Sequence, residues 1–197
     1  MSNFALHADD RAVRHNRHDS NRGVENREGS EMNESINQKK LYEKLYVSRA
    51  DFDLAEQYAR FLLKKGWHSA PYERRGSIYM QQTAFTTSLV VSYSRPFTKS
   101  FGWPKFPGYL MPYDDHMMQL HNKILRLRHQ VYAHSDAGHY SICLWDHPGF
   151  QTEIVGAPFF QLDKSECEDL VKMISAIDKL LGSELLRLRK ILPHELP

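Results

Sequence analysis

Apolar residues recur at intervals of three and four positions along most of the chain, which is the spacing of one face of an α-helix. Segments with this spacing cover residues 39–47, 48–65, 75–94, 112–133 and 163–193. A helix with one apolar face must bury that face against a partner. We therefore predict a mainly α fold, an antiparallel bundle of four to five helices that occupies residues 39–193.

Capping and breaking residues predict where several of these helices begin and end. Ser48, with Asp51 three residues later, is typical of a helix N-cap, so two helices rather than one are expected before Gly66. Gly66 ends the second of them. The last helix is expected to begin at an N-cap formed by Asp163 or Ser165.

Two segments depart from the simple helical pattern. Residues 86–93, TTSLVVSY, are rich enough in β-branched residues to fit a strand. The surrounding run, residues 75–94, exceeds the roughly three to ten residues of an ordinary strand and favours a helix. Between His139 and Phe160, two short runs of alternating polarity flank turn residues, so we predict a short β-hairpin inserted before the last helix.

A long loop, residues 97–113, follows the third helical segment. Its glycines and prolines forbid a regular element. Aromatic rings are spaced along it, at Phe97, Phe101, Trp103, Phe106 and Tyr109. We expect the rings to cover one end of the bundle, because a loop this long is either functional or pinned by its own side chains. Alternatively, the rings stack on the bases of single-stranded RNA, with Lys99 and Lys105 supplying positive charge.

Residues 1–38 are rich in Asn, Asp, Glu, Arg, Ser and His and show no apolar period. Such a segment buries too little apolar surface to offset the entropy lost when it orders. Its arginines alternate with acidic residues, so it is not a basic arm for nucleic acid. We predict a disordered N-terminal tail.

The composition is that of an ordinary single-domain protein. Across 197 residues, 26 lysines and arginines are set against 24 acidic residues, for a formal net charge of +2. This balance gives no general attraction to nucleic acid, so any RNA site must be local. No stretch approaches the roughly 18 continuous apolar residues of a membrane span, and the N-terminus lacks a signal-peptide core. We therefore expect a cytoplasmic protein with no membrane partner.

The cysteines and histidines do not form a recognisable metal site. Cys143 and Cys167 fit neither a disulfide framework nor a CxxC metal knuckle. None of the 11 histidines stands at a zinc spacing with neighbouring acids or cysteines. We expect neither a metal nor any other cofactor.

One polar residue continues the apolar face of residues 112–133. That face is formed by Met117, Leu120, Ile124, Leu127 and Val131. The next position on it is His134, six residues after Arg128. Histidine exchanges a proton near its ordinary pKa of about 6.5, and arginine grips phosphate oxygens with a planar fork. The pair suits phosphodiester chemistry, although both residue types also stabilise helix C-termini without any catalytic role.

The run from Arg128 to Asp136, RHQVYAHSD, resembles the arginine-x(4 to 6)-histidine motif of the HEPN family (higher eukaryotes and prokaryotes nucleotide-binding). The resemblance is strongest to the branch associated with abortive infection and toxin-antitoxin modules. Members of that family are helical bundles, commonly dimeric, and many are metal-independent ribonucleases with this arginine and histidine in the active site. The resemblance implies an RNA-binding hydrolase, an endoribonuclease in which Arg128 and His134 are catalytic.

The same resemblance implies roles and partners. His134 would move a proton at the ribose 2′-hydroxyl or the 5′-oxygen leaving group, while Arg128 would neutralise charge on the phosphate. Four neighbouring residues are expected to contact the substrate: His129, Tyr132, Ser135 and Asp136. The implied partners are RNA, a second copy of the chain in a homodimer, and an antitoxin protein.

A straight helix would hold Arg128 and His134 apart. Six residues turn about 600°, which leaves the two side chains about 120° apart around the axis and about 9 Å apart along it. Either the helix unwinds at Ala133, or a two-fold partner brings a second copy of the pair into a shared cleft. The family resemblance favours the dimer.

Two alternatives fit the same residues. Many catalytic members carry Asn or Asp directly after the arginine, where this chain has His129. Members modified by a partner nucleotidyltransferase carry a tyrosine where Asp136 stands. A non-catalytic module that binds nucleotide, RNA or protein in the same basic cleft is one alternative. The other is a purely structural dimer in which Arg128 pairs with an acid such as Asp136.

Overall fold

The computed structural model describes residues 12–68, 76–129, 141–156 and 162–192. Within them the fold is mainly helical, as predicted, with one β-hairpin between the last two helices. The helices are α1 (Ala12–Lys65), α2 (Gly76–Ser94), α3 (Asp115–Leu127) and α4 (Lys164–Ile191). Two short 3₁₀ helices, η1 (Arg95–Phe97) and η2 (Gly108–Leu110), lie between α2 and α3.

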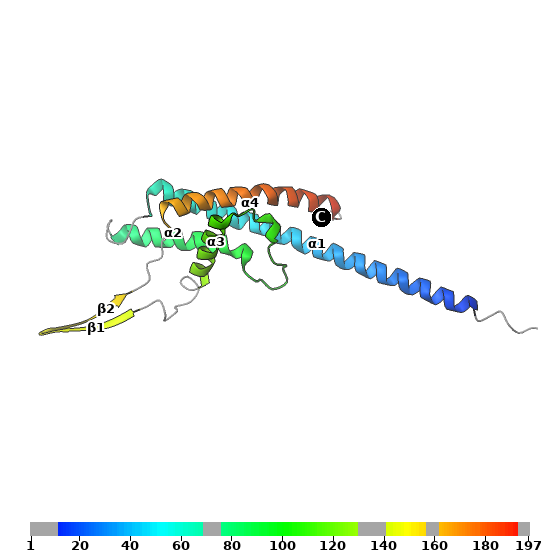
Figure 1. Ribbon diagram of the computed structural model, residues 1–197, viewed down its shortest axis with the longest axis horizontal. Helices are drawn as coiled ribbons and strands as arrows, with labels where there is room; N and C mark the ends of the chain where they lie inside the picture. The colour runs from blue at the N-terminus through cyan, green and yellow to red at the C-terminus, as the bar shows by residue number, and fades with distance from the viewer. Residues whose placement is uncertain (1–11, 69–75, 130–140, 157–161, 193–197) are drawn as a thin grey trace, which may run out of the picture.

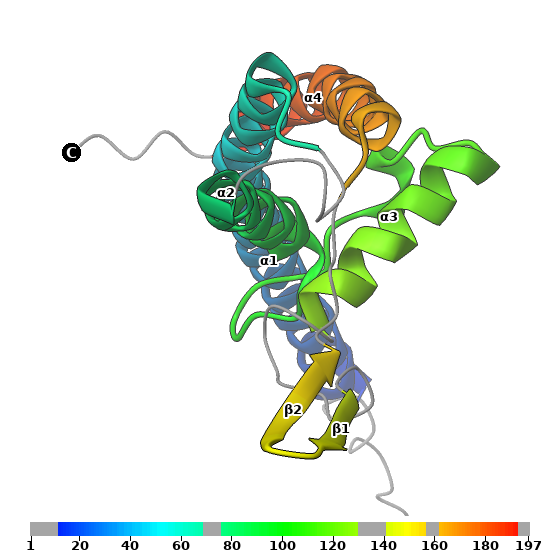
Figure 2. The same ribbon diagram turned by 90° about the vertical axis from the view of Figure 1, so that its left-hand side faces the viewer.

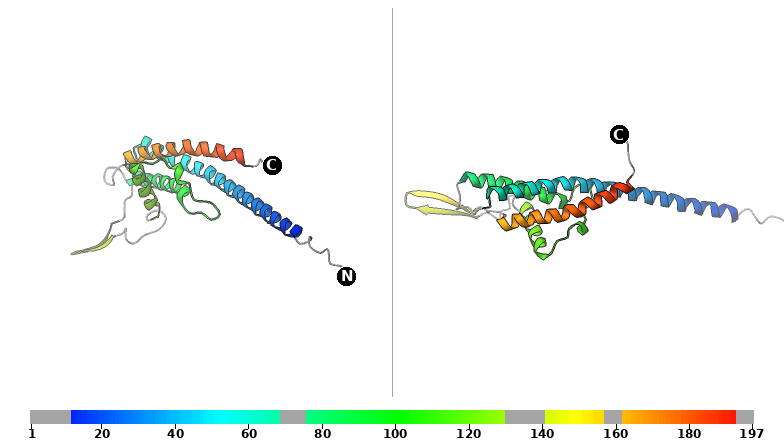
Figure 3. Two further views of the ribbon diagram at one scale, coloured as in Figure 1. Left: turned by 45° about the vertical axis from the view of Figure 1, so that its right-hand side comes forward. Right: turned by 90° about the horizontal axis from the view of Figure 1, so that it is seen from above.

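The three longer helices form the body of the bundle. The C-terminal part of α1 packs against both α2 and α4, and α1 runs antiparallel to each of them (Figure 1). Helix α3 is shorter and crosses this layer at a steep angle (Figure 2). The N-terminal part of α1 extends beyond the other helices (Figure 3).

Helix α1 is one continuous element where the sequence predicted two helices. The side chain of Ser48 does not cap a new helix; its hydroxyl donates a hydrogen bond to the carbonyl of Lys44, four residues earlier, at 2.7 Å. Serine within a helix commonly makes this bond. Because no glycine or proline lies between Ser30 and Lys65, nothing interrupts the helix there.

The predicted tail, residues 1–38, overlaps α1, which begins at Ala12; residues 1–11 lie outside the described part of the chain. A helix is costly to nucleate but cheap to extend. The buried segment that follows supplies the nucleus, so polar residues such as Glu34 and Gln38 continue it, with a 3.3 Å hydrogen bond between their side chains. Composition alone does not account for this extension.

The core is built from the faces that the sequence pattern identified. Phe52, Ala55, Ala59 and Leu62 of α1 are buried, and so are Leu120, Ile124 and Leu127 of α3. Helix α4 contributes the longest stripe: Leu170, Met173, Ile174, Ile177, Leu181 and Leu188. These side chains form one continuous hydrophobic cluster that holds the bundle together.

The loop between η1 and α3 only partly follows its prediction. Phe106 is buried and Phe97 packs against the core, so these two rings do cover the end of the bundle. Phe101 and Tyr109 are exposed, and Trp103 keeps 37% of its surface accessible. The loop therefore presents aromatic rings to solvent as well as to the core.

Helices α3 and α4 both begin at an aspartate. Asp114 accepts a hydrogen bond from the Met117 amide at 2.8 Å, so α3 starts slightly later than the predicted Pro112. Asp163, one of the two predicted caps, forms a capping box with Glu166 at the start of α4. Both caps satisfy amides that a helix start leaves without partners.

The predicted hairpin is confirmed as β1 (Ser141–His147) and β2 (Phe150–Gly156), which pair antiparallel. Gly149 has a φ of +88° in the connecting turn, a conformation that glycine adopts without strain. The hairpin projects away from the helices (Figure 1). Within the described chain, no helix combines the length and apolar character needed to span a membrane.

Candidate functional site

Arg128 stands at the point where α3 changes its geometry. Its amide hydrogen is shared between the carbonyls of Ile124 and Leu125, and Arg128 and His129 continue as a π-helical turn. Such turns often occur at functional sites. The helix expected through residue 133 is α-helical as far as Leu127, and residues 130–133 lie outside the described chain.

The side chains of Arg128 and His129 contact each other. The distance from Arg128 Nη1 to His129 Nδ1 is 3.2 Å. Because a guanidinium only donates hydrogen bonds, Nδ1 must accept, so this contact requires a neutral His129 with its proton on Nε2. The residue after the motif arginine thus helps to orient the guanidinium.

Arg128 lines a pocket of about 370 Å³ formed by three separate parts of the chain. Helix α1 forms one wall, η1 and the loop after it form the second, and the end of α3 contributes Arg128. The lining residues are Lys44, Val47, Ser48, Asp51, Arg95, Thr98, Lys99, Ser100, Trp103 and Arg128. We call this the cationic pocket.

Positive charge dominates this lining. Four cations, Lys44, Arg95, Lys99 and Arg128, face a single carboxylate, Asp51. Arg95 Nη1 lies 3.3 Å from Asp51 Oδ1, so one cation is paired. Burial raises the pKa of Asp51, and the Arg95 contact opposes that rise. Three cations remain to attract an anion into a space partly shielded from water, where electrostatic attraction is stronger than in bulk solvent.

Lys44 is the most deeply buried of these cations. Only 3% of its surface is exposed, and its ammonium lies 5.6 Å from the centre of the Trp103 ring. Among the described residues it has no hydrogen-bond acceptor and no ion-pair partner within 4 Å. Burial lowers the pKa of Lys44, while Asp51 acts in the opposite direction. A phosphate oxygen would supply an acceptor and favour the charged form of Lys44.

The structure tests only part of the predicted site. Arg128 and His129 are described, whereas Tyr132, His134, Ser135 and Asp136 lie within residues 130–140, outside the described chain. Whether His134 approaches the cationic pocket therefore stays a prediction.

Among the other pocket residues, sequence patterns offered Lys99 and Trp103 as an alternative RNA-contacting set but did not predict Lys44, Asp51 or Arg95. Lys44, Asp51 and Arg95 are far from the motif in sequence, and only the packing of α1 against η1 brings them to Arg128. One signal was present: Lys44 lies one helical turn before Ser48 on a face that is otherwise buried. A lysine in that position is rare enough to mark a site.

A second buried polar cluster lies in the core beside α3. The Tyr93 hydroxyl is 3.0 Å from His121 Nδ1 and 2.9 Å from the Tyr113 hydroxyl. Burial lowers the pKa of His121 to about 4, so the ring is neutral at pH 7. The tautomer of the neutral ring decides whether Nδ1 accepts from the Tyr93 hydroxyl or donates to it. Burial raises the pKa of Tyr93. This closed network orders the core and has no evident place for a substrate.

Over the described residues, no group of three or more His, Cys, Asp or Glu side chains is arranged to hold a metal ion. His116, which the sequence places near Asp114 and Asp115, instead pairs with Asp169 at 3.0 Å.

Comparisons with known proteins give no match. No family model fits the chain, no curated protein is similar to it, and no solved structure matches its fold. The HEPN resemblance of residues 128–136 therefore stays a prediction based on the motif.

Proposed function

We propose that the protein binds RNA through phosphates held in the cationic pocket and acts as an endoribonuclease. One observation carries the proposal: the motif arginine, Arg128, lines a single pocket with three other cations, including the buried Lys44. A guanidinium matches two phosphate oxygens at once, and an ammonium adds a compact charge. The pocket thus suits the charge that develops on a phosphodiester during cleavage.

In this proposal the ribose 2′-oxygen attacks the neighbouring phosphorus, and the bond from phosphorus to the 5′-oxygen breaks. A base removes the 2′-hydroxyl proton and an acid protonates the leaving 5′-oxygen, with His134 serving in one of these roles. Arg128 stabilises the non-bridging oxygens. The products are a 2′,3′-cyclic phosphate and a free 5′-hydroxyl, so RNA is cut and DNA is not.

The remaining assignments follow from the motif. His129, Tyr132, Ser135 and Asp136 contact the RNA around the cut. The HEPN resemblance implies a metal-independent reaction, a homodimer in which a second His134 supplies the other proton-transfer group, and a cytoplasmic role as a toxin or phage-defence component restrained by an antitoxin.

A non-catalytic RNA- or nucleotide-binding module is the second candidate. One observation favours it: the only carboxylate in the described lining, Asp51, is paired with Arg95 and is poorly placed to act as a base. Without a contribution from residues 130–140, such a pocket would bind phosphate and leave it intact.

The test is incubation of total RNA and a tRNA pool with purified protein in EDTA, with sequencing of the fragment ends. We expect cuts bearing cyclic phosphates from the wild type, and a loss of at least about a hundredfold in rate for His134→Ala and for Arg128→Ala. Arg126→Ala is the matched control, because Arg126 is exposed on the same helix and does not line the pocket.

Each result selects between the candidates. Binding without cuts, weakened by Arg128→Ala and unchanged by Arg126→Ala, selects the binding module. Absence of both cutting and binding across this RNA range rejects the RNA proposal.

A further inference from the structure

We propose that a small apolar pocket beside the cationic pocket is a nucleobase subsite, which holds the base next to the phosphate that the cationic pocket binds. This inference rests on the proposed RNA binding and specifies how the same surface recognises a single strand. The apolar walls of the small pocket are Phe97, Trp103, Pro104 and Phe106. We call it the aromatic pocket.

The two pockets share a wall. Thr98, Lys99, Ser100 and Trp103 line both of them. A ligand that places an anion against Lys44 and Lys99 can therefore extend past Trp103 into the adjoining apolar pocket. A nucleotide has this bipolar character, since its phosphate is strongly anionic and its base is flat and weakly polar.

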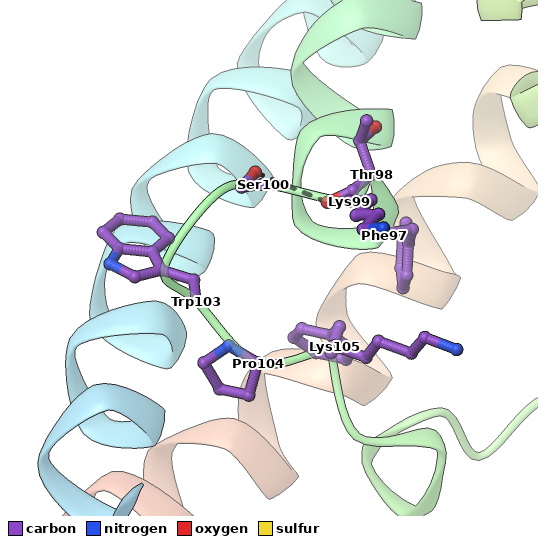
Figure 4. Close-up of a pocket in the computed structure, with 8 residues that line it drawn as sticks. Phe97, Thr98, Lys99, Ser100, Trp103, Pro104 and Lys105 are labelled. Carbon is purple, nitrogen blue, oxygen red and sulfur yellow. Dashed lines mark hydrogen bonds between the residues drawn. The ribbon is translucent and has the colours of Figure 1, made fainter. Parts of the chain in front are cut away.

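The shape and size of the aromatic pocket suit one base. Phe97 lies on one side of it and Trp103 on the other, with the indole turned away from Phe97 toward α1, and the loop carrying Pro104 passes between them (Figure 4). Its volume is about 200 Å³. This is smaller than the roughly 300 to 1,000 Å³ typical of pockets for drug-sized ligands, so a single ring system fits better than a whole nucleotide.

The walls are held in place before any ligand arrives. The Phe97 and Phe106 rings pack edge to face with their centroids 5.2 Å apart. The Phe97 and His121 rings are also nearly perpendicular, with their centroids 4.6 Å apart. On the other side, Gly102 has a φ of +80°, which forms the turn that presents Trp103. A preformed apolar slot loses little entropy when it binds a flat ring.

Trp103 lines both pockets, so a ligand that spans them would contact it. It is the largest ring in the loop, it keeps 37% of its surface exposed, and Lys44 lies over it at 5.6 Å. Aromatic side chains bind single-stranded nucleic acid by stacking on bases in a sequence-tolerant way. A purely structural tryptophan would be expected to bury more of its surface.

The test uses a protein in which Trp103 is the sole tryptophan, made by Trp67→Phe and Trp145→Phe. It is titrated with a 2′-O-methyl RNA hexamer, which the 2′-hydroxyl mechanism cannot cut, and with the same hexamer carrying abasic riboses. We expect the intact hexamer to quench Trp103 fluorescence and to bind about tenfold more tightly than the abasic one.

Affinities of two variants complete the test. Trp103→Ala should lower affinity for the intact hexamer about tenfold and leave affinity for the abasic hexamer unchanged. Phe101→Ala is the control, because Phe101 is a fully exposed ring in the same loop that lines neither pocket. Thermal unfolding of each variant, followed by circular dichroism, confirms that its fold is retained.

Failure of the subsite is distinguishable from failure of RNA binding. Equal affinities for the two hexamers, with no change in Trp103→Ala, would overturn the base subsite and leave phosphate binding intact. Binding of neither hexamer would reject the proposed function and the subsite together. Tighter binding by Trp103→Ala would show that the ring occupies the pocket itself, which also overturns the subsite.

Discussion

Lys44 carries a charge that is surrounded by protein but has no ion-pair partner within the described part of the chain. A buried charge costs free energy unless a partner offsets its lost hydration. In this chain the nearest compensation comes from the Trp103 ring and the field of Asp51. A residue that is suited to binding a ligand often makes the ligand-free protein less stable than a substitute at the same position would. Lys44 fits this description.

We therefore predict opposite effects of Lys44→Met on stability and on RNA binding. Methionine keeps the length of the side chain and removes the charge, so the free energy of unfolding should rise by about 1 kcal/mol. RNA affinity should fall roughly tenfold, because a charge-assisted contact to phosphate is lost. Urea denaturation and RNA titration measure the two effects.

Lys40→Met is the control for this pair of measurements, since Lys40 is exposed one turn earlier on α1. Neither the free energy of unfolding nor the RNA affinity of the Lys40→Met protein should differ appreciably from the wild-type values. A Lys44→Met protein that is clearly less stable than the wild type would show that the ammonium has a structural role.

His121 predicts a pH dependence of stability. Its pKa is lowered to about 4 in the folded protein, whereas the unfolded chain titrates near the ordinary value of about 6.5. As the pH falls through 6.5, the unfolded state takes up a proton that the folded state does not, so stability decreases until about pH 4. The loss over this interval is on the order of 3 kcal/mol.

Urea unfolding at a series of pH values measures this loss, and His121→Phe should remove most of it. Tyr93 and Tyr113, the polar groups that face the ring, stay protonated throughout this range because burial raises the pKa of each. An unchanged pH profile in His121→Phe would assign the acid sensitivity to other groups.

At the scale of the elements, sequence patterns predicted the features that depend on contacts between residues close together in the chain. The buried stripes of α3 and α4 followed from helical spacing, the hairpin followed from alternation around a turn, and the start of α4 followed from an aspartate cap. Each of these depends on residues within a few positions of one another. Such features can be predicted from one sequence because the determining contacts are short-range.

The errors arose where context overrides a local signal. Ser48 has the residue type and spacing of a cap, yet α1 continues because packing against α2 and α4 stabilises a helix through that point. The polar residues 12–38 have no apolar period, yet they extend a helix that is already nucleated. At Ser48 the capping signal was weaker than the packing of the surrounding buried helix.

The cationic pocket could be predicted at Arg128 and, as an alternative interpretation of the aromatic loop, at Lys99 and Trp103. The other cations come from α1, η1 and the following loop, which are more than 25 positions away along the chain, and their approach depends on tertiary packing. The spacing of Arg128 and His134 indicates phosphodiester chemistry, but it carries no information on which side chains distant in the sequence line the same pocket. The buried Lys44 was the one local anomaly that pointed to the same place.

At the scale of the whole molecule, the formal net charge of +2 is near neutral, so the proposed RNA binding would depend on the local charge of the cationic pocket. Affinity for single-stranded nucleic acid falls with salt in proportion to the number of phosphates neutralised, by about 0.7 in the logarithmic slope for each. We predict that Lys99→Ala reduces this slope by about 0.7. RNA titrations between low and moderate potassium chloride concentrations measure it.

Lys64→Ala is the corresponding control, because Lys64 is exposed near the C-terminal end of α1 and is not part of either pocket. Its slope should equal that of the wild type. Equal reductions in both variants would mean that RNA contacts a diffuse surface rather than the cationic pocket.

Helix α1 also determines how the molecule moves in solution. At 54 residues it is about 80 Å long, and its N-terminal part extends past the bundle as an arm. An elongated particle has more friction than a sphere of equal mass, so a single chain should elute from a gel-filtration column earlier than its mass suggests. An apparent dimer by elution volume would therefore be the expected behaviour of a monomer, and light scattering or equilibrium sedimentation is the measurement that counts chains.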